Sequence, residues 1–208
     1  MITKEELVKA VPFIFHLTDK RNLDFVKKVG KLYSTVSLVE QSNAANKEEL
    51  LTVRRPEHLS VKIDDNEIHI RDQRPLNAAL DRCLTVGWTR KQYIYLLNSR
   101  VFFWPNIGRL RTHFSRYQLE QPIIMKVAIN DALVKNPHLE LCHLNSGATR
   151  PLGILGGRAP ERGENTFVTI EHYEKGVNKI AEVTFPNEFT IPDRIEVSNS
   201  PDGEWTIF

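Results

Sequence analysis

The spacing of apolar residues predicts short helices in the first part of the chain, each with a recognisable end. Thr3-Lys4-Glu5-Glu6 has the capping-box pattern that opens a helix, which we expect to run to about Ala10. A strand over 13–17 and a helix over 21–29 follow. Gly30 marks the end of that helix, because glycine readily adopts the left-handed conformation found there. The chain is therefore expected to begin as helix, strand and helix.

Alternation of apolar and polar residues predicts strands later in the chain. The alternating stretch over 58–73 turns at Asp64-Asp65-Asn66 and predicts a β-hairpin. Further strands are expected at 99–104, 122–129, 139–145, 166–173, 179–185 and 194–199, and further helices at 47–53, 75–86, 89–97 and 107–117. Because helices concentrate in the first half and strands in the second, the sequence predicts an α+β fold with a mostly antiparallel, split sheet.

Composition favours a single domain over 1–208, since 208 residues with 41% apolar content are enough for a substantial core. No run approaches the roughly 18 apolar residues that span a bilayer, and the start of the chain lacks a signal-peptide pattern. We therefore expect a cytoplasmic protein without membrane contact. Cys83 and Cys142 have neither metal-site spacing nor the density of a disulfide scaffold, which favours two buried thiols.

Charge is distributed unevenly, although the net charge of +2 indicates no partner by itself. Residues 82–119 contain seven Lys or Arg, eight aromatic residues and no Asp or Glu. Cations follow a phosphate backbone and exposed rings stack on bases, so this segment is typical of nucleic-acid binding. The alternative is that the rings belong to the core and the arginines are solvated.

Familiar nucleotide-binding and hydrolytic motifs are absent from the sequence. There is no P-loop, no Rossmann fingerprint and no G-x-S-x-G elbow, and "GILGGRAPERG" lacks the G-x-G-x-x-G spacing. His138 and His143 are five residues apart, which is a weak metal signal, so no metal is expected.

Three polar positions stand out because their surroundings are apolar or strand-like. His16 ends an apolar run and is either a core histidine bonded to a backbone carbonyl or a ligand-binding residue. Glu182 lies in the middle of a strand and faces either water or a cleft, because charged side chains are seldom buried without a partner. The third position is the pair Arg54-Arg55, whose simplest interpretation is an exposed surface.

These positions lie in segments that resemble the DarT family of ADP-ribosyltransferases, which modify nucleic acid using NAD. The segments are His16-Leu17-Thr18, Asn22-Leu23, Gly30-Lys31-Leu32, Arg54-Arg55, the aromatic strand at 101–104, and Ala181-Glu182 with the Pro-containing stretch 186–195. Their order and rough spacing match the family, and the resemblance indicates a divergent sister subfamily with an ADP-ribosyltransferase-like sheet. Residues 63–95, which include Arg71-Asp72-Gln73-Arg74, have no counterpart in the family pattern.

The resemblance implies a role for each of its segments. Glu182 would hold a hydroxyl of the nicotinamide ribose and stabilise the positive charge that develops as nicotinamide leaves. His16 would bond the ribose on the adenosine side, and the main chain of Leu17 or Thr18 would pair with the carboxamide. Arg54 would bind the pyrophosphate or the substrate phosphate, since an arginine is a poor base.

Further residues are implied around this centre. Phe25 and Tyr33 would line the NAD pocket, with helix packing as the alternative. The long Gly/Arg-rich loop over 146–164 would present the acceptor, and arginines suit phosphate binding and base stacking. The acceptor-contacting residues would be Arg150, Arg158 and Arg162.

The resemblance thus implies an enzyme that transfers ADP-ribose from NAD to a base of single-stranded DNA or RNA and releases nicotinamide. Its setting would be a toxin or anti-phage system, with an antitoxin protein as a candidate partner. A protein ADP-ribosyltransferase and a tRNA 2′-phosphotransferase of the same fold are alternatives, and the latter would use His16, Arg54, Arg71 and Arg74 around a phosphate. A module that binds NAD-like or nucleic-acid ligands without turnover is the alternative from another class.

Overall fold

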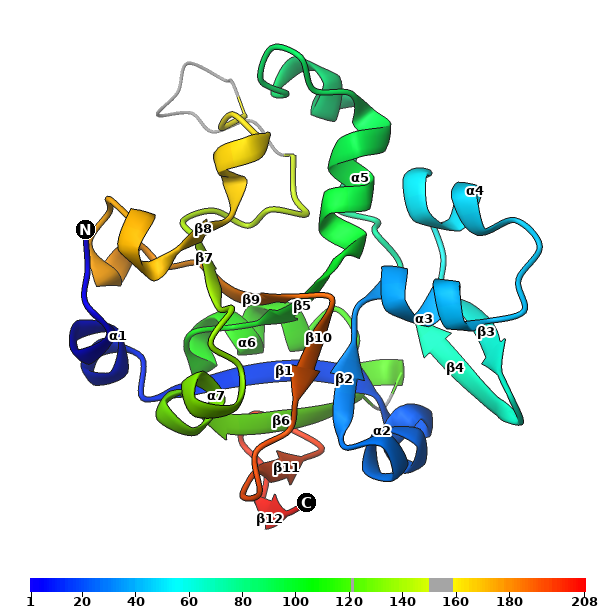
Figure 1. Cartoon of the computed structure of the whole chain (residues 1–208). Helices are drawn as coiled ribbons and strands as arrows, with labels where there is room; N and C mark the ends of the chain where they lie inside the picture. The colour runs from blue at the N-terminus through cyan, green and yellow to red at the C-terminus, as the bar shows by residue number, and fades with distance from the viewer. Residues whose placement is uncertain (121, 150–158) are drawn as a thin grey trace.

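The computed structural model describes residues 1–120, 122–149 and 159–208, and it has a mixed α+β architecture (Figure 1). The helices are α1 (Lys4–Ala10), α2 (Leu23–Val29), α3 (Thr35–Gln41), α4 (Lys47–Thr52), α5 (Arg90–Asn98), α6 (Ile107–Phe114) and α7 (Ile129–Lys135). The strands are β1 (Phe13–Asp19), β2 (Lys31–Tyr33), β3 (Leu59–Ile63), β4 (Asn66–Ile70), β5 (Arg100–Phe103), β6 (Pro122–Ala128), β7 (Glu140–Cys142), β8 (Val168–Thr169), β9 (Glu182–Pro186), β10 (Glu188–Thr190), β11 (Glu196–Ser198) and β12 (Thr206–Ile207). The α+β prediction is confirmed, and the helices concentrate before residue 99, but strands occur throughout the chain.

The paired strands are antiparallel and form small sheets. One sheet has the order β1-β6-β11-β12 and another the order β5-β9-β7-β8, while β2 pairs with β10 and β3 with β4. β1 pairs with β6 along its whole length, from Phe13 opposite Ala128 to Asp19 opposite Pro122. Between β1 and the end of β5, the described residues make a single bridge, Phe15 to Trp104. Main-chain pairing between the two larger sheets is therefore limited to this bridge among the described residues.

Aromatic packing holds two neighbouring strands, β5 and β9, beside each other. Phe103 on β5, Phe185 on β9 and Phe189 on β10 are buried, and their ring centroids lie 4.7–5.4 Å apart. Burial of rings of this size dominates core energetics. The cluster therefore holds β5 and β9 rigidly beside each other, with Val101 opposite Phe185 in their register.

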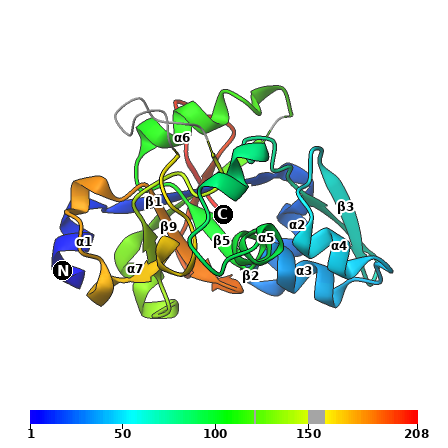
Figure 2. The same cartoon turned by 90° about the horizontal axis from the view of Figure 1, so that it is seen from above.

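The elements divide between the two ends of the molecule. Viewed from above, α1 and α7 lie at one end, and α3, α4 and the β3–β4 hairpin lie at the other (Figure 2). The helices of the described residues include none long and apolar enough to cross a membrane. Nor do the described residues contain a group of three His, Cys, Asp or Glu side chains able to hold a metal ion.

Several local signals in the sequence act as expected. The Thr3 hydroxyl accepts from the N–H of Glu6, and the Glu6 carboxylate accepts from the N–H of Thr3, which completes the capping box of α1. Gly30 ends α2 at a φ of +65°. The predicted hairpin is β3–β4, and its turn holds Asp64 at a φ of +49°, a value that Asp tolerates better than most residues.

Other local expectations are corrected. The helix expected over 75–86 is wrong, because only a 3-10 segment, Ala78–Arg82, forms there. A tertiary contact holds its start: Asn77 accepts from the N–H of Ala79 and from the hydroxyl of Thr149. The sequence interpretation missed α3 and α7, although Ser34, whose hydroxyl accepts from the N–H of Ser37, is an ordinary cap signal for α3.

The basic and aromatic segment over 82–119 does not form a continuous cationic surface. Its rings are largely in the core, and Tyr93, Phe103 and Tyr117 are buried. Several of its cations are paired with acids from elsewhere in the chain: Arg90 with Asp81, Lys91 with Glu48, Arg100 with Glu140 and Arg111 with Asp202. The alternative that places the rings in the core therefore describes this segment better than an exposed nucleic-acid surface.

Candidate functional site

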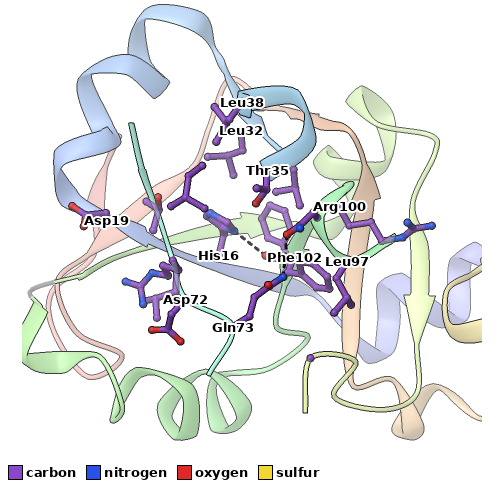
Figure 3. A pocket seen from close by; sticks show the side chains of 18 of the residues that line it. His16, Asp19, Leu32, Thr35, Leu38, Asp72, Gln73, Leu97, Arg100 and Phe102 are labelled. Atoms are coloured by element: carbon purple, nitrogen blue, oxygen red, sulfur yellow. Dashed lines mark hydrogen bonds between the residues drawn. The ribbon is translucent and has the colours of Figure 1, made fainter. Parts of the chain in front are cut away.

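A cavity of about 300 Å³ lies where β1 and β5 separate (Figure 3). Its walls come from β1, the α2–β2 region, the segment after β4, β5, the loop after β7, and β9. This volume is at the lower end of the range for pockets that bury small organic ligands, about 300–1,000 Å³. This cavity is therefore the candidate functional site.

The structure brings most of the predicted site residues together in this cavity. The residues that line it come from segments as far apart in the chain as β1 and β9: His16, Leu17, Thr18, Phe25, Tyr33 and Glu182. Phe25 and Tyr33 pack with their ring centroids 6.3 Å apart. These two rings therefore pack together and also line the cavity, while NAD as the ligand of this cavity stays a prediction.

His16 bridges the gap between the two sheets. Its Nδ1 lies 2.8 Å from the carbonyl oxygen of Phe102, so the neutral imidazole carries its proton on Nδ1 and donates it there. Burial, with a smaller effect from the charge of Arg71, lowers the His16 pKa to about 4. At neutral pH His16 is therefore uncharged, and its Nε2 is an acceptor suited to a ligand hydroxyl.

The main chain of Leu17 points toward the same gap. Phe15 exchanges both backbone hydrogen bonds with Trp104, so the N–H and C=O of Phe15 face β5. Alternate residues of a strand point their hydrogen-bonding groups to the same side. Leu17 therefore faces away from β6, and among the described residues β5 does not pair with it. Thr18 faces β6, which makes Leu17 the residue of the two whose main chain is available.

Glu182 is a buried carboxylate with one open oxygen. The side chain lines the cavity and the residue is 3% exposed. Its Oε1 accepts from the main-chain N–H of Ser146 at 3.1 Å, while its Oε2 has no hydrogen-bond partner among the described residues. Burial raises the Glu182 pKa to about 7, against the opposing effect of the Ser146 hydrogen bond. The strand position of Glu182 is thus a cleft position, as the resemblance implied.

Arg162 is corrected from an acceptor-contacting residue to an internal one. It is 2% exposed, and its guanidinium donates to the carbonyl oxygens of Asn145 and Ser146 at 3.3 Å. It also donates to the carbonyl oxygens of Ala148 and Pro160. Because its donors are used in this way, Arg162 shapes the loop that presents the Ser146 N–H to Glu182. Arg150 and Arg158 lie outside the described residues.

The Arg54-Arg55 pair is also corrected. Arg54 is not among the residues that line the cavity, because its guanidinium donates to the carbonyl oxygens of Gln73 at 3.3 Å and Arg74 at 3.0 Å. Arg55 lines the cavity and donates from Nη1 to Asn98 Oδ1 at 2.9 Å. Burial lowers the Arg55 pKa to about 10. Of the two arginines, Arg55 is therefore the one that lines the cavity.

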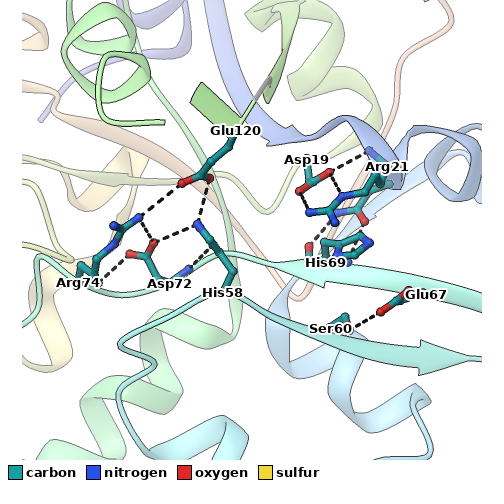
Figure 4. Close-up of polar contacts among 10 residues, drawn as sticks. Asp19, Arg21, His58, Ser60, Glu67, His69, Asp72, Arg74 and Glu120 are labelled. Carbon is teal, nitrogen blue, oxygen red and sulfur yellow. Dashed lines mark hydrogen bonds and ion pairs between the residues drawn. The ribbon is translucent and has the colours of Figure 1, made fainter. Parts of the chain in front are cut away.

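The sequence interpretation gave no role to Arg71-Asp72-Gln73-Arg74, yet this segment forms one wall. Asp72 is ion-paired with Arg74 at 2.7 Å, and its Oδ2 lies 3.3 Å from Nε2 of His58, whose Nδ1 accepts from the N–H of Asp72 (Figure 4). His58 also reaches Glu120 at 3.0 Å, which joins the segment after β4 to the segment before β6. The signal that marks this wall is a run of four polar residues directly after an alternating strand.

Arg71 lies against this wall. Its Nε and Nη1 are buried and have no hydrogen-bond partner among the described residues. Its guanidinium carbon lies 4.5 Å from the centroid of the Tyr117 ring. Burial lowers the Arg71 pKa from its ordinary value.

Asn22 attaches the hairpin to the rest of the site. Its side-chain amide donates to the carbonyl oxygen of His69 at 2.8 Å and accepts from the N–H of His69 at 2.9 Å. Asn22 is buried, so both bonds are shielded from water. Asn22, which lies in one of the segments that resemble the DarT family, therefore positions β4, and with it Arg71, beside β1.

Residues 12–198 match the model of DUF7002, which is described as a family of unknown function. No curated protein matches the chain, and no solved structure matches it.

Proposed function

The chain belongs to the DUF7002 family of unknown function, and we propose that it is an enzyme that transfers ADP-ribose from NAD to a base of single-stranded DNA or RNA, releasing nicotinamide. The observation that carries this proposal is the buried Glu182, whose Oε2 lacks a partner among the described residues, in the same cavity as His16 and Leu17. Burial of a carboxylate costs free energy of folding, so the presence of one in the cavity favours a chemical role.

The groups in the cavity match the parts of NAD. The N–H and C=O of Leu17, which do not pair with another strand among the described residues, suit the carboxamide of nicotinamide, which carries an NH2 donor group and a carbonyl acceptor. The Nε2 of His16 suits a ribose hydroxyl on the adenosine side, and the Oε2 of Glu182 suits a hydroxyl of the nicotinamide ribose. The ADP-ribosyltransferase fold is part of this proposal, and the gap between β1 and β5 supports it.

In the proposed reaction the bond between nicotinamide and ribose breaks, and its electron pair stays with the nicotinamide nitrogen. A ring or amino nitrogen of the base forms the new bond to the ribose carbon, and the proton of that nitrogen passes to solvent. Positive charge develops on the ribose in the transition state. A preorganised carboxylate aimed at such charge lowers the barrier by roughly 3 kcal/mol.

The acceptor rests on the resemblance to the DarT family, as do the toxin or anti-phage setting and an antitoxin partner. The ion pairs and buried rings of residues 82–119 lend the acceptor little support. A single strand is the expected substrate form, because a base is reached most easily where it is unstacked. The 2′-phosphotransferase alternative has less support, since Arg54 lies outside the cavity lining and Arg74 is paired with Asp72.

The test is incubation with NAD labelled in its adenylate phosphate and three acceptors: single-stranded DNA, single-stranded RNA and bulk protein. Glu182→Gln is the test variant, and Glu204→Gln, at an exposed position, is the matched control. Label on a nucleic acid that is lost only in Glu182→Gln is the expected result. Label on protein alone would overturn the acceptor class. Intact NAD with no label would overturn the enzyme and leave a binding module.

A further inference from the structure

We propose that Arg71, stacked on Tyr117, forms an anion subsite of the cavity that binds a phosphate group of a nucleotide. The inference deepens the proposed function, because NAD carries such phosphates and the identity of the nucleotide as NAD rests on that function. Nucleotide binding at Arg71 does not require the transfer reaction, so different measurements test the subsite and the proposed transferase.

The first observation is the state of the guanidinium itself. Nε and Nη1 of Arg71 are buried and lack hydrogen-bond partners among the described residues, although the side chain lines the cavity. An unsatisfied buried donor carries its full desolvation penalty, and the penalty is larger for a charged group. Native proteins leave few such groups, and those that persist call for a ligand or a functional reason. A phosphate supplies the missing acceptors.

The second observation is that the acids nearest to Arg71 are engaged by other cations. Asp72 pairs with the Arg74 guanidinium at 2.7 Å, and Glu120 pairs with the same guanidinium at 3.6 Å (Figure 4). Asp19 is held by Arg21, which donates from Nε at 2.9 Å and from Nη2 at 2.7 Å. Within the described residues Arg71 therefore has no ion pair, and its charge remains available to a ligand.

The third observation concerns orientation. The guanidinium carbon of Arg71 lies 4.5 Å from the Tyr117 ring centroid, a distance at which a cation is attracted to the face of an aromatic ring. The Tyr117 hydroxyl bonds Asp72 Oδ1 at 3.4 Å, which ties the ring to the same wall. The Tyr117 ring supplies no oxygen acceptor, so Nε and Nη1 of Arg71 still lack one among the described residues. A planar fork of donors matches two phosphate oxygens at once.

The surroundings favour a nucleotide over a free anion. Arg55 and the exposed Arg116 also line the cavity and have no carboxylate partner among the described residues, so this site has an excess of positive charge. The Phe25 and Tyr33 rings line the same cavity and offer an apolar surface to a base. Phosphate recognition and base packing are therefore available within one site.

The experiment is isothermal titration of the whole chain with ADP, adenosine and inorganic phosphate. We expect ADP to bind, and Arg71→Gln to weaken its affinity at least tenfold, with partial recovery in Arg71→Lys because the charge returns without the fork. The matched control is Arg82→Gln, at an exposed position away from the cavity lining, which should leave ADP affinity unchanged. Adenosine affinity should not change in any variant.

Several results would overturn the inference. They are absence of ADP binding, equal ADP affinity in Arg71→Gln, and inorganic phosphate binding as tightly as ADP, which would mark a plain anion site. Loss of folding in both Arg71 variants would also overturn it, since it would make Arg71 structural. Wild-type protein that binds ADP through Arg71 but never consumes NAD would leave the subsite intact and remove the proposed transferase. If Arg71→Gln transfers ADP-ribose and binds NAD as tightly as the wild type, the subsite would be removed and the proposed transferase would stand.

Discussion

The main-chain N–H of Ser146 donates to Oε1 of Glu182 across 3.1 Å, while Oε2 of the same carboxylate has no partner among the described residues. One oxygen is thus held by the protein and the other is left for a ligand. Because the held oxygen is fixed by a main-chain group, the carboxylate cannot rotate freely. The burial of this carboxylate, which outweighs the Ser146 hydrogen bond, sets the direction of two pH effects.

The rate of NAD cleavage should rise with pH through about 7. Burial raises the Glu182 pKa to about 7, so the carboxylate is mainly protonated below that pH and mainly charged above it. The charged form is the one that stabilises a developing cation. The measurement is kcat on both sides of pH 7, and a rate that stays constant from pH 5 to pH 8 would exclude Glu182 as the charged group.

The same pKa shift affects stability in the opposite direction. A carboxyl whose pKa is raised in the folded state stabilises the fold fully below its ordinary pKa of 4.5, and this contribution is lost as the pH rises through about 7. Relative to the wild type, Glu182→Gln should therefore have a higher unfolding free energy at pH 8 than it does at pH 5. Urea unfolding at the two pH values measures this, with Glu204→Gln as the unchanged control.

Two buried histidines should act in the opposite sense to Glu182 and favour unfolding as the pH falls below 6.5. Burial lowers the pKa of His16 to about 4 and that of His113 to about 3, from an ordinary value of 6.5. The unfolded chain therefore binds protons that the folded chain does not bind, and the contribution of these two histidines to the unfolding free energy falls as the pH drops from 6.5 toward 4. At 1.36 kcal/mol per pKa unit, His16 alone accounts for about 3 kcal/mol.

The measurement for the histidines is the urea midpoint at pH 7 and at pH 5. His113→Gln should flatten this dependence, because glutamine does not titrate. A slope unchanged in His113→Gln would show that the imidazole of His113 accepts its proton in the folded state as readily as in the unfolded one.

Arg162→Gln should lower the free energy of unfolding by about 3 kcal/mol or more, since removing a buried charge that is fully hydrogen-bonded leaves several carbonyl groups without donors. Arg82→Gln is the exposed control and should change stability by less than about 0.5 kcal/mol. Thermal unfolding of the two variants checks this. A mild effect at Arg162 would return that side chain to the set of ligand-binding candidates.

Asn22→Ala should destabilise the chain by about 2 kcal/mol, because it removes two buried bonds to the main chain of His69. It should also weaken ligand binding, since the hairpin carries Arg71 into the cavity wall. Asn178→Ala makes the same substitution at an exposed position and is the matched control. A stable Asn22→Ala protein with unchanged ligand affinity would show that the hairpin is positioned by its apolar face alone.

The sequence was informative where a signal is local. The capping box of α1, the Gly30 stop of α2 and the turn at Asp64 depend on neighbours within a few residues, and each is confirmed. A short window marked His16 and Glu182 as unusual polar positions, but it left open whether each one faces the core, water or a cleft. Their meeting in one cavity was implied only by the family resemblance.

The sequence failed where contacts are distant. Which arginine of Arg54-Arg55 turns inward depends on Asn98, more than forty residues away along the chain. Arg162 looks exposed in a glycine-rich stretch, and only the carbonyls brought by the loop after β7 make it internal. The unopposed cations of residues 82–119 find their acids at Glu48, Glu140 and Asp202, which no local window contains.

The one-sided pairing of β1 divides its residues into two sets. Ile14, His16 and Thr18 direct their amides toward β6, whereas Leu17 directs its amide toward the cavity. In deuterated water the amide protons of the first set should exchange slowly and the proton of Leu17 rapidly. A ligand that hydrogen-bonds to the main chain of Leu17 would slow the exchange of this amide and remove the difference. Amide exchange along β1 therefore detects ligand binding without a labelled ligand and without turnover.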